Sequence, residues 1–156
     1  MWNGMLIDFG DALRLSEVGY GRGTRPYKGI GVDLGGPNSF INDVESFFWA
    51  LFWICIYREG PVISNRIVIP FDEWYYLDGP EVAVRKRDVV RDEVEFLRIA
   101  EKYFNAYHRP LTPWVNKLRQ IVFPNGEPRT ELDPSICDAM AEILKEAESD
   151  KLVRNE

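Results

Sequence analysis

The chain has 156 residues, of which 46% are hydrophobic and 28% charged, a composition typical of a folded domain and not of a disordered segment. Its formal net charge of −6 argues against a nucleic-acid partner, because neutralising phosphates requires a surplus of Lys and Arg. The short basic run at residues 85–87 is followed by acidic residues. It predicts a solvated face, with a nuclear-targeting signal as the lesser alternative.

Cysteine usage and the first residues bear on the cellular compartment. Cys55 and Cys137 form neither a disulfide framework nor a metal-ligand spacing, so we expect two thiols in a reducing environment. Residues 1–6 lack a basic region followed by a long apolar stretch, so no secretory signal is expected. The longest apolar run, residues 47–56, is much shorter than the roughly 20 residues of a membrane span. These features predict an intracellular protein, cytoplasmic or nuclear, with no membrane partner.

The N-terminal quarter contains short apolar stretches and then a region without periodicity. Residues 5–9 and 12–15 predict a pair of small strands around a turn. Residues 16–38 are rich in Gly and Pro, so we expect a long, mobile loop. The run G-Y-G-R-G at 19–23 resembles a phosphate-binding loop, but it lacks the Lys and Ser or Thr of such a loop. A flexible loop is the better interpretation.

The central apolar run predicts a buried helix. Asn42 followed three positions later by Glu45 is a capping box, which predicts a helix over residues 43–57 that ends near Gly60 and Pro61. We expect this to be the most buried helix. Its expected core residues are Phe48, Leu51, Phe52 and Cys55.

The C-terminal half predicts three further helices. Residues 67–74 are compatible with a short strand or an irregular segment, and residues 88–104 predict a second helix. Thr112 and Pro113 form an N-cap and first-turn pair for a third helix, and residues 133–134 begin a fourth. The expected face of the second helix is Val90, Val94, Leu97 and Phe104. A polar tail covers 149–156, and the absence of a linker predicts one mainly α domain over residues 1–156.

One motif points to phosphate chemistry. Asp8-Phe9-Gly10 follows an apolar stretch, where a carboxylate can hold Mg²⁺ against nucleotide phosphates while the phenyl packs inward and Gly permits the turn. Such a triplet often occurs by chance. Its context adds weight: G-T-R-P-Y ends at Tyr27, and D-V-E-S-F-F-W-A-L-F-W-I begins at Asp43.

With P-L-T-P-W-V-N-K-L-R and F-P-N-G further on, the chain resembles the fungal-type protein kinase family over residues 5–147. The resemblance implies a protein kinase-like C-terminal lobe that begins just before the D-F-G element. A small N-terminal strand pair and a central buried helix belong to that lobe. The implied family activity is phosphoryl transfer from ATP-Mg to a protein Ser or Thr.

The resemblance also assigns roles to individual residues. It makes Asp8 the metal ligand, which binds the ATP cofactor by holding Mg²⁺ against the nucleotide phosphates, and residues 16–38 an activation-segment loop. It implies that Thr24 contacts the catalytic Asp of a kinase and that Asp43 holds the backbone of the catalytic loop. Both also have a structural explanation: Thr24 as a turn residue, Asp43 as a first-turn acid favoured by the helix dipole. The activation-segment residues are Phe9, Gly10, Thr24 and Tyr27.

The departures from the family pattern bear on activity. The Gly-rich loop, strand lysine, catalytic-loop Asp and metal-binding Asn all precede the D-F-G element, and only seven residues precede Asp8 here. We therefore expect no catalytic residue in this chain, no tightly bound Mg or ATP, and no activity in isolation. Gly31 stands where the family has a Glu that anchors the segment. This predicts a lost ion pair and a looser segment.

Two functions remain open. The chain is either a partial protein kinase domain, whose partners are a protein substrate and a missing N-lobe, or a non-catalytic interaction module derived from a kinase lobe. Apolar residues at 1–7 favour the first, because they fit an edge where another lobe packs. The loop also offers phosphorylation sites, with Arg14, Arg22 and Arg25 as partners for a new phosphate. These sites are Ser16, Tyr20, Thr24 and Tyr27.

Overall fold

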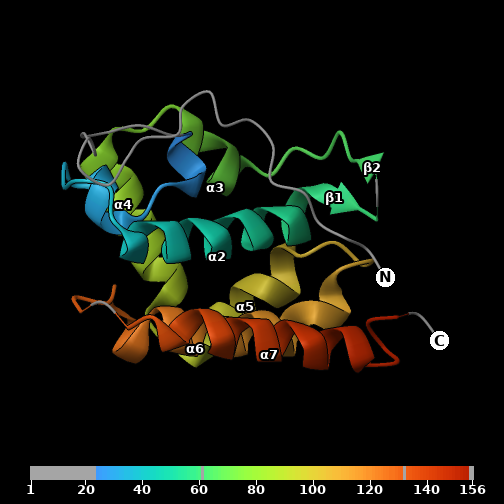
Figure 1. Cartoon of the computed structure of the whole chain (residues 1–156). Coiled ribbons are helices and arrows are strands. Elements are labelled where there is room, and N and C mark those ends of the chain that lie inside the picture. The colour runs from blue at the N-terminus through green and yellow to red at the C-terminus, as the bar shows by residue number, and fades with distance from the viewer. Residues whose placement is uncertain (1–23, 61, 132, 155–156) are drawn as a thin grey trace.

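The computed structural model describes residues 24–60, 62–131 and 133–154, which are mainly helical, as predicted (Figure 1). The expected strand pair at 5–9 and 12–15 lies outside the described residues. Within them, β1 (Arg58–Glu59) pairs antiparallel with β2 (Val62–Ile63). The helices are η3 (Arg25–Tyr27), α1 (Ile30–Asp33), α2 (Phe40–Tyr57), α3 (Ile69–Asp72), η4 (Glu73–Tyr75), α4 (Gly79–Val90), α5 (Glu93–Tyr103), η5 (Arg109–Leu111), α6 (Thr112–Val122), η6 (Pro124–Gly126) and α7 (Ser135–Ser149).

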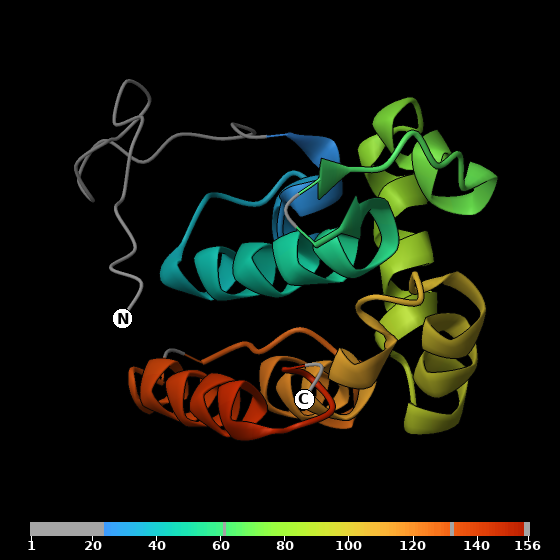
Figure 2. The ribbon, with the colours of Figure 1, turned by 90° about the vertical axis from the view of Figure 1, so that its right-hand side faces the viewer.

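The helices form two layers around α2. In Figure 1, α1 and α3 lie above α2, and α6 and α7 lie below it. Figure 2 shows the same layers from the side, with α4 running between them. Contacts of α2 with α1 and α6, and of α4 with α1 and α5, join the layers into one core. The central helix therefore supports elements from both halves of the described chain.

The central helix is buried much as its sequence predicts. Phe48, Phe52 and Cys55 are fully buried, and Leu51 is partly buried against the core. The helix is long and apolar enough to cross a membrane by length and composition, but nine of its 18 residues are buried within the fold. It serves here as a core helix. Its outer face is open, because Phe47 and Ile54 are 45% and 42% exposed.

The start of α2 differs from the predicted capping box. Ser39 is the N-cap, and its Oγ accepts a hydrogen bond from the Asn42 N–H at 3.4 Å. Glu45 does not reach back to the cap; its Oε2 accepts from the Ile30 N–H at 2.8 Å. The helix begins earlier because Ser39 is extended and satisfies one of its first N–H groups. Glu45 is therefore available to satisfy the start of α1.

The predicted helix over 88–104 is two helices. Asp92 accepts from the Glu95 N–H at 2.8 Å and caps α5, so the chain breaks between Val90 and Glu93. The break changes the helical register, so the expected face is wrong at Val94 and Leu97, which are 80% and 38% exposed, whereas Val90 and Phe104 are buried as predicted. The buried face of α5 is instead Phe96, Ile99 and Ala100.

Two other segments were expected to be less regular than they are. Residues 67–74 contain α3 and part of η4 rather than a strand or an irregular segment. The long loop expected at 16–38 is wrong over residues 25–33, because η3 and α1 form there and bury Pro26, Ile30 and Val32. Residues 34–38 form no helix, and residues 16–23 lie outside the described residues. The predicted third and fourth helices are confirmed as α6 and α7. Thr112 is the first residue of α6 and not its cap.

Candidate functional site: a cleft between α1 and the start of α2

Three of the residues predicted to act in the site line one cleft. The cleft has a volume of about 280 Å³ and lies between the Thr24–Gly29 stretch, α1 and the first turns of α2. Thr24, Tyr27 and Asp43 all line it, although Asp43 is distant in the sequence from the other two. Asp8, Phe9 and Gly10 lie outside the described residues. The other lining side chains include Lys28, Asn38, Asn42 and Ser46.

Thr24 is held at the mouth of the cleft by the turn that follows it. The Tyr27 N–H donates to the Thr24 carbonyl at 3.0 Å, and Pro26 is buried in the same turn. The side chain of Thr24 makes no capping hydrogen bond and the residue is exposed. Its hydroxyl is therefore positioned to contact another group.

Asp43 lies in the first turn of α2, where the helix dipole favours a carboxylate. Asp43 is exposed, and partial desolvation raises the pKa of its carboxyl group above the ordinary value. Among the described residues its carboxylate has no hydrogen-bond or ion-pair partner. An acceptor on a rigid helix start is thus available to donors outside the described chain.

Asn42 forms the floor of the cleft. Its Nδ2 donates to the Pro37 carbonyl at 2.9 Å and to the Ser39 Oγ at 3.0 Å. Its Oδ1 faces Gly29 so closely that a Cβ there would lie 2.5 Å away. The glycine allows α1 to approach α2, and the close packing fixes the width of the cleft.

A buried lysine anchors the cleft wall from behind. Lys86 Nζ donates to Asp33 Oδ2 at 2.6 Å and to the carbonyls of Lys28 and Arg25 at 2.6 and 3.0 Å. Gly31 has no carboxylate, but Asp33 forms a buried ion pair two residues later. The ion pair predicted to be lost at Gly31 is thus accompanied by a different, buried ion pair in the same segment. The looser segment stays a prediction.

Sequence reasoning missed Lys86 because it lies in the basic run 85–87, whose neighbours reach solvent. Arg85 is exposed, whereas Lys86 is completely buried, so the predicted solvated face is wrong at this position. The available signal was the spacing of Lys86 from Val82, Val89 and Val90, which share the buried side of α4. Its Nζ also lies 5.5 Å from the Trp49 ring centroid, a cation–π distance.

The same region holds a second buried carboxyl group. Glu45 is 1% exposed, and burial raises its pKa to about 7 despite the hydrogen bond from the Ile30 N–H. Burial also raises the pKa of Asp33 and lowers that of Lys86, while their mutual attraction opposes both changes. The wall behind the cleft is therefore sensitive to protonation.

The described residues contain no group of three or more His, Cys, Asp or Glu side chains that could hold a metal ion. Asp8, the metal ligand implied by the sequence resemblance, lies outside the part of the chain that the structure describes. The geometry of the described residues therefore bears on Thr24, Tyr27 and Asp43 and does not test metal binding.

Comparison with known proteins gives one match. Residues 1–55 match the family described as fungal protein kinase. The matched range contains the D-F-G element, Thr24, Asp43 and most of α2, so the resemblance seen in the sequence is confirmed over these residues. No curated protein and no solved structure matches the chain.

Proposed function

We propose that this chain, whose residues 1–55 match the fungal protein kinase family, forms the C-terminal lobe of a protein kinase domain. The complete domain would transfer the terminal phosphoryl group of ATP-Mg to a Ser or Thr of a protein substrate. The observation that carries the proposal is the cleft in which Thr24, Tyr27 and Asp43 converge. These are the residues to which the resemblance gives substrate-side and loop-supporting roles.

Phosphoryl transfer depends on positioning and on electrostatic stabilisation. In the proposed domain, the Thr24 hydroxyl hydrogen-bonds the catalytic Asp and fixes its orientation. The Asp43 carboxylate, held at the rigid start of α2, accepts hydrogen bonds from backbone N–H groups of the catalytic loop. Asp8 is the proposed ligand of Mg²⁺, which neutralises phosphate charge when bound.

We further propose that these 156 residues alone transfer no phosphate. Their sequence contains no catalytic-loop motif of the H-R-D type. Positioning the phosphates therefore requires an ATP-binding part, which is the proposed partner together with the protein substrate. The proposed setting is intracellular, where ATP-Mg is present.

The test is phosphate transfer from labelled ATP-Mg to a generic protein substrate. We expect none from the purified chain, and transfer when a polypeptide supplies the ATP-binding lobe and catalytic loop of a fungal-type kinase. Asp8→Asn should abolish the restored transfer while leaving the unfolding temperature unchanged. Mg-dependent phosphorylation by the isolated chain, lost on Asp8→Asn, would contradict the proposal.

The second candidate is a non-catalytic interaction module. It is favoured by large apolar side chains at the described surface, where Ile67 is 80% and Tyr76 86% exposed. The two candidates differ in the same assay. A module that only binds partners gives no transfer with any added lobe, whereas the kinase lobe does.

A further inference from the structure

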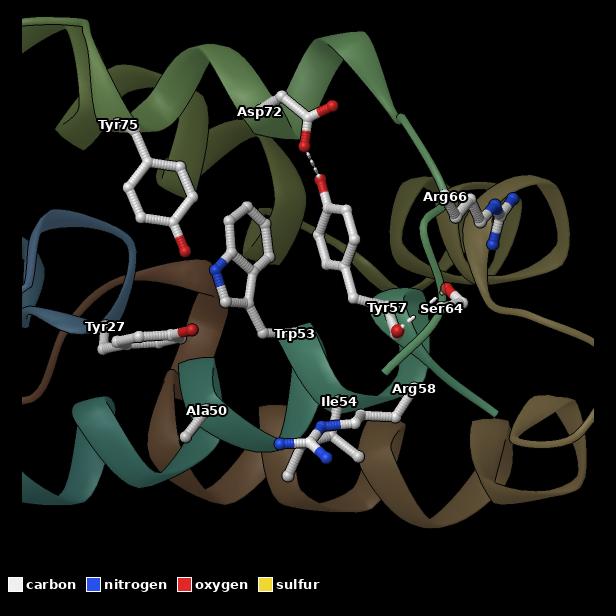
Figure 3. A pocket seen from close by; sticks show the side chains of 10 residues that line it. All are labelled: Tyr27, Ala50, Trp53, Ile54, Tyr57, Arg58, Ser64, Arg66, Asp72 and Tyr75. Atoms are coloured by element: carbon white, nitrogen blue, oxygen red, sulfur yellow. Dashed lines mark hydrogen bonds between the residues drawn. The ribbon is translucent and has the colours of Figure 1, made fainter. Parts of the chain in front are cut away.

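A second cavity lies beside the C-terminal half of α2, separate from the centre of the cleft. Its volume is about 520 Å³, within the range of known ligand sites. Tyr27 borders it on one side, and the segment from β1 to η4 borders it on the other (Figure 3). The floor comes from α2. The cavity is thus built from three parts of the chain.

Aromatic rings form most of the walls. The Trp53 ring lies edge-on to Tyr27 and Tyr57, with centroids 6.3 and 4.8 Å away, and is stacked with Tyr75 at 6.0 Å. Trp53 itself is 5% exposed, so its ring is held by packing. Rigid rings present apolar area with little loss of side-chain entropy on binding. These aromatic walls can therefore bind an apolar side chain of a ligand.

A buried donor lies among these rings. Trp53 Nε1 is inaccessible to solvent and has no hydrogen-bond partner in the described part of the chain. In Figure 3 it points toward the side of the cavity where the Tyr27 and Tyr75 hydroxyls lie. An unsatisfied buried N–H is unfavourable. A small shift of the exposed Tyr75 ring, which stays at the edge of the cavity, gives this donor a carbonyl or carboxylate acceptor.

The charges around the cavity are mostly positive. Arg58 and Arg66 line it with one carboxylate, Asp72. Asp72 is already engaged, because it accepts from the Tyr57 hydroxyl and from the Val68 N–H at 2.8 Å. Arg66 is turned toward the Tyr103 carbonyl at 2.6 Å, and Arg58 extends beside Ile54 (Figure 3). The chain has a net charge of −6, whereas the side chains that line this cavity carry more positive than negative charge.

We propose that this cavity binds an acidic peptide. An apolar side chain of the peptide packs against Trp53, a neighbouring carboxylate lies near Arg58, and Ile54 and Tyr75 form an apolar rim. A polyanion such as RNA fits less well, because the net charge of −6 repels its many phosphates. This binding goes beyond the proposed phosphoryl transfer and does not require it.

The test is a fluorescence anisotropy titration of the whole chain with a short dye-labelled peptide of Glu, Phe and Gly, without ATP. We expect binding that weakens with salt and that falls by about tenfold for Arg58→Glu, the loss of one ion pair. Arg85→Glu is the matched control, because it makes the same charge change at an exposed position on α4. It should leave the affinity within about twofold.

A second variant separates binding from folding. Tyr75 is 46% exposed on η4, so Tyr75→Ala should keep the fold, which thermal unfolding checks. The same variant should still lower the affinity for the peptide. Equal affinities for the Arg58→Glu and Arg85→Glu proteins would overturn the proposal. So would equal binding of a peptide with Lys in place of Glu, or equally strong competition by a single-stranded RNA.

Discussion

Lys86 and Asp33 form a buried ion pair, with 2.6 Å between Nζ and Oδ2 and side chains that are 0% and 1% exposed. The pair joins α4 to the end of α1. Because Lys86 also holds the carbonyls of Arg25 and Lys28, it fixes the wall of the cleft that carries Thr24 and Tyr27. The cleft depends on this single ammonium group.

Replacing Lys86 should destabilise the fold strongly. In Lys86→Met the Asp33 carboxylate stays buried without its cation, and we expect a loss of about 3–5 kcal/mol in the free energy of unfolding. Urea unfolding followed by Trp fluorescence measures it. Lys86→Met with Asp33→Leu should recover much of the loss.

The control for Lys86 is the neighbouring Arg87 on α4, which forms an exposed ion pair with Glu127. Arg87 and Glu127 are 41% and 63% exposed, so Arg87→Met should change the free energy of unfolding by less than about 1 kcal/mol. If Lys86→Met and Arg87→Met were equally mild, the anchoring role of Lys86 would be wrong.

The buried Glu45 predicts a pH dependence of stability. Its pKa of about 7 in the native state lies above the ordinary 4.5, so the native state binds this proton more tightly than the unfolded state. Its stabilising contribution is complete below about pH 4.5 and is lost as the pH rises through about 7. The free energy of unfolding should fall by up to about 3 kcal/mol between about pH 5 and pH 8.

Glu45→Gln isolates this effect, because Gln keeps an acceptor for the Ile30 N–H and does not titrate. Lys86, Asp33 and Arg87, which also act on Glu45, remain in both proteins. The stability of the variant should depend less on pH. Exposed Glu142→Gln is the control and should follow the unsubstituted chain. Parallel curves for the Glu45→Gln and unsubstituted proteins would contradict the assignment.

Because α4 and α1 lie close together at Gly79, adding a methyl group there should destabilise the fold. A Cβ on Gly79 would lie 2.1 Å from the Asp33 carbonyl oxygen, a backbone atom that cannot easily move. Gly79→Ala should therefore lower the free energy of unfolding by about 1–3 kcal/mol. Gly31→Ala is the control, since its Cβ meets nothing closer than 3.4 Å. Thermal unfolding of both variants measures the difference, and equal effects would be evidence against close packing.

Periodicity in the sequence predicted the core side of α2 and the extents of α6 and α7, because these helices are long and amphipathic or buried. It did not predict where α2 and α5 begin, since several residues near each start can cap and the choice depends on partners from elsewhere. Ser39 caps α2 while Glu45 is drawn to Ile30. The sequence likewise predicts a solvated Lys86, because a local pattern does not show its distant partners. Its partners at Arg25, Lys28 and Asp33 are distant in the sequence.

The structure brings Thr24, Tyr27 and Asp43 to one cleft, an arrangement that the sequence does not predict. The roles that the resemblance gives these residues stay predictions. The aromatic cavity was not foreseen, because Tyr27, Trp53 and Tyr75 come from separate segments and look like ordinary core or surface rings until the fold brings them together.

The central claim is that the cleft of Thr24 and Asp43 serves phosphoryl transfer, and the most direct test is Thr24→Val in the assembly with an added ATP-binding lobe. Thr24 is exposed, so the fold should be unaffected. We predict a fall in the transfer rate of about a hundredfold, as expected when a positioning contact is lost. Thr112→Val, which removes a buried hydroxyl without a partner on α6, should leave the rate unchanged. A Thr24→Val protein that transfers phosphate at the unsubstituted rate would contradict the account.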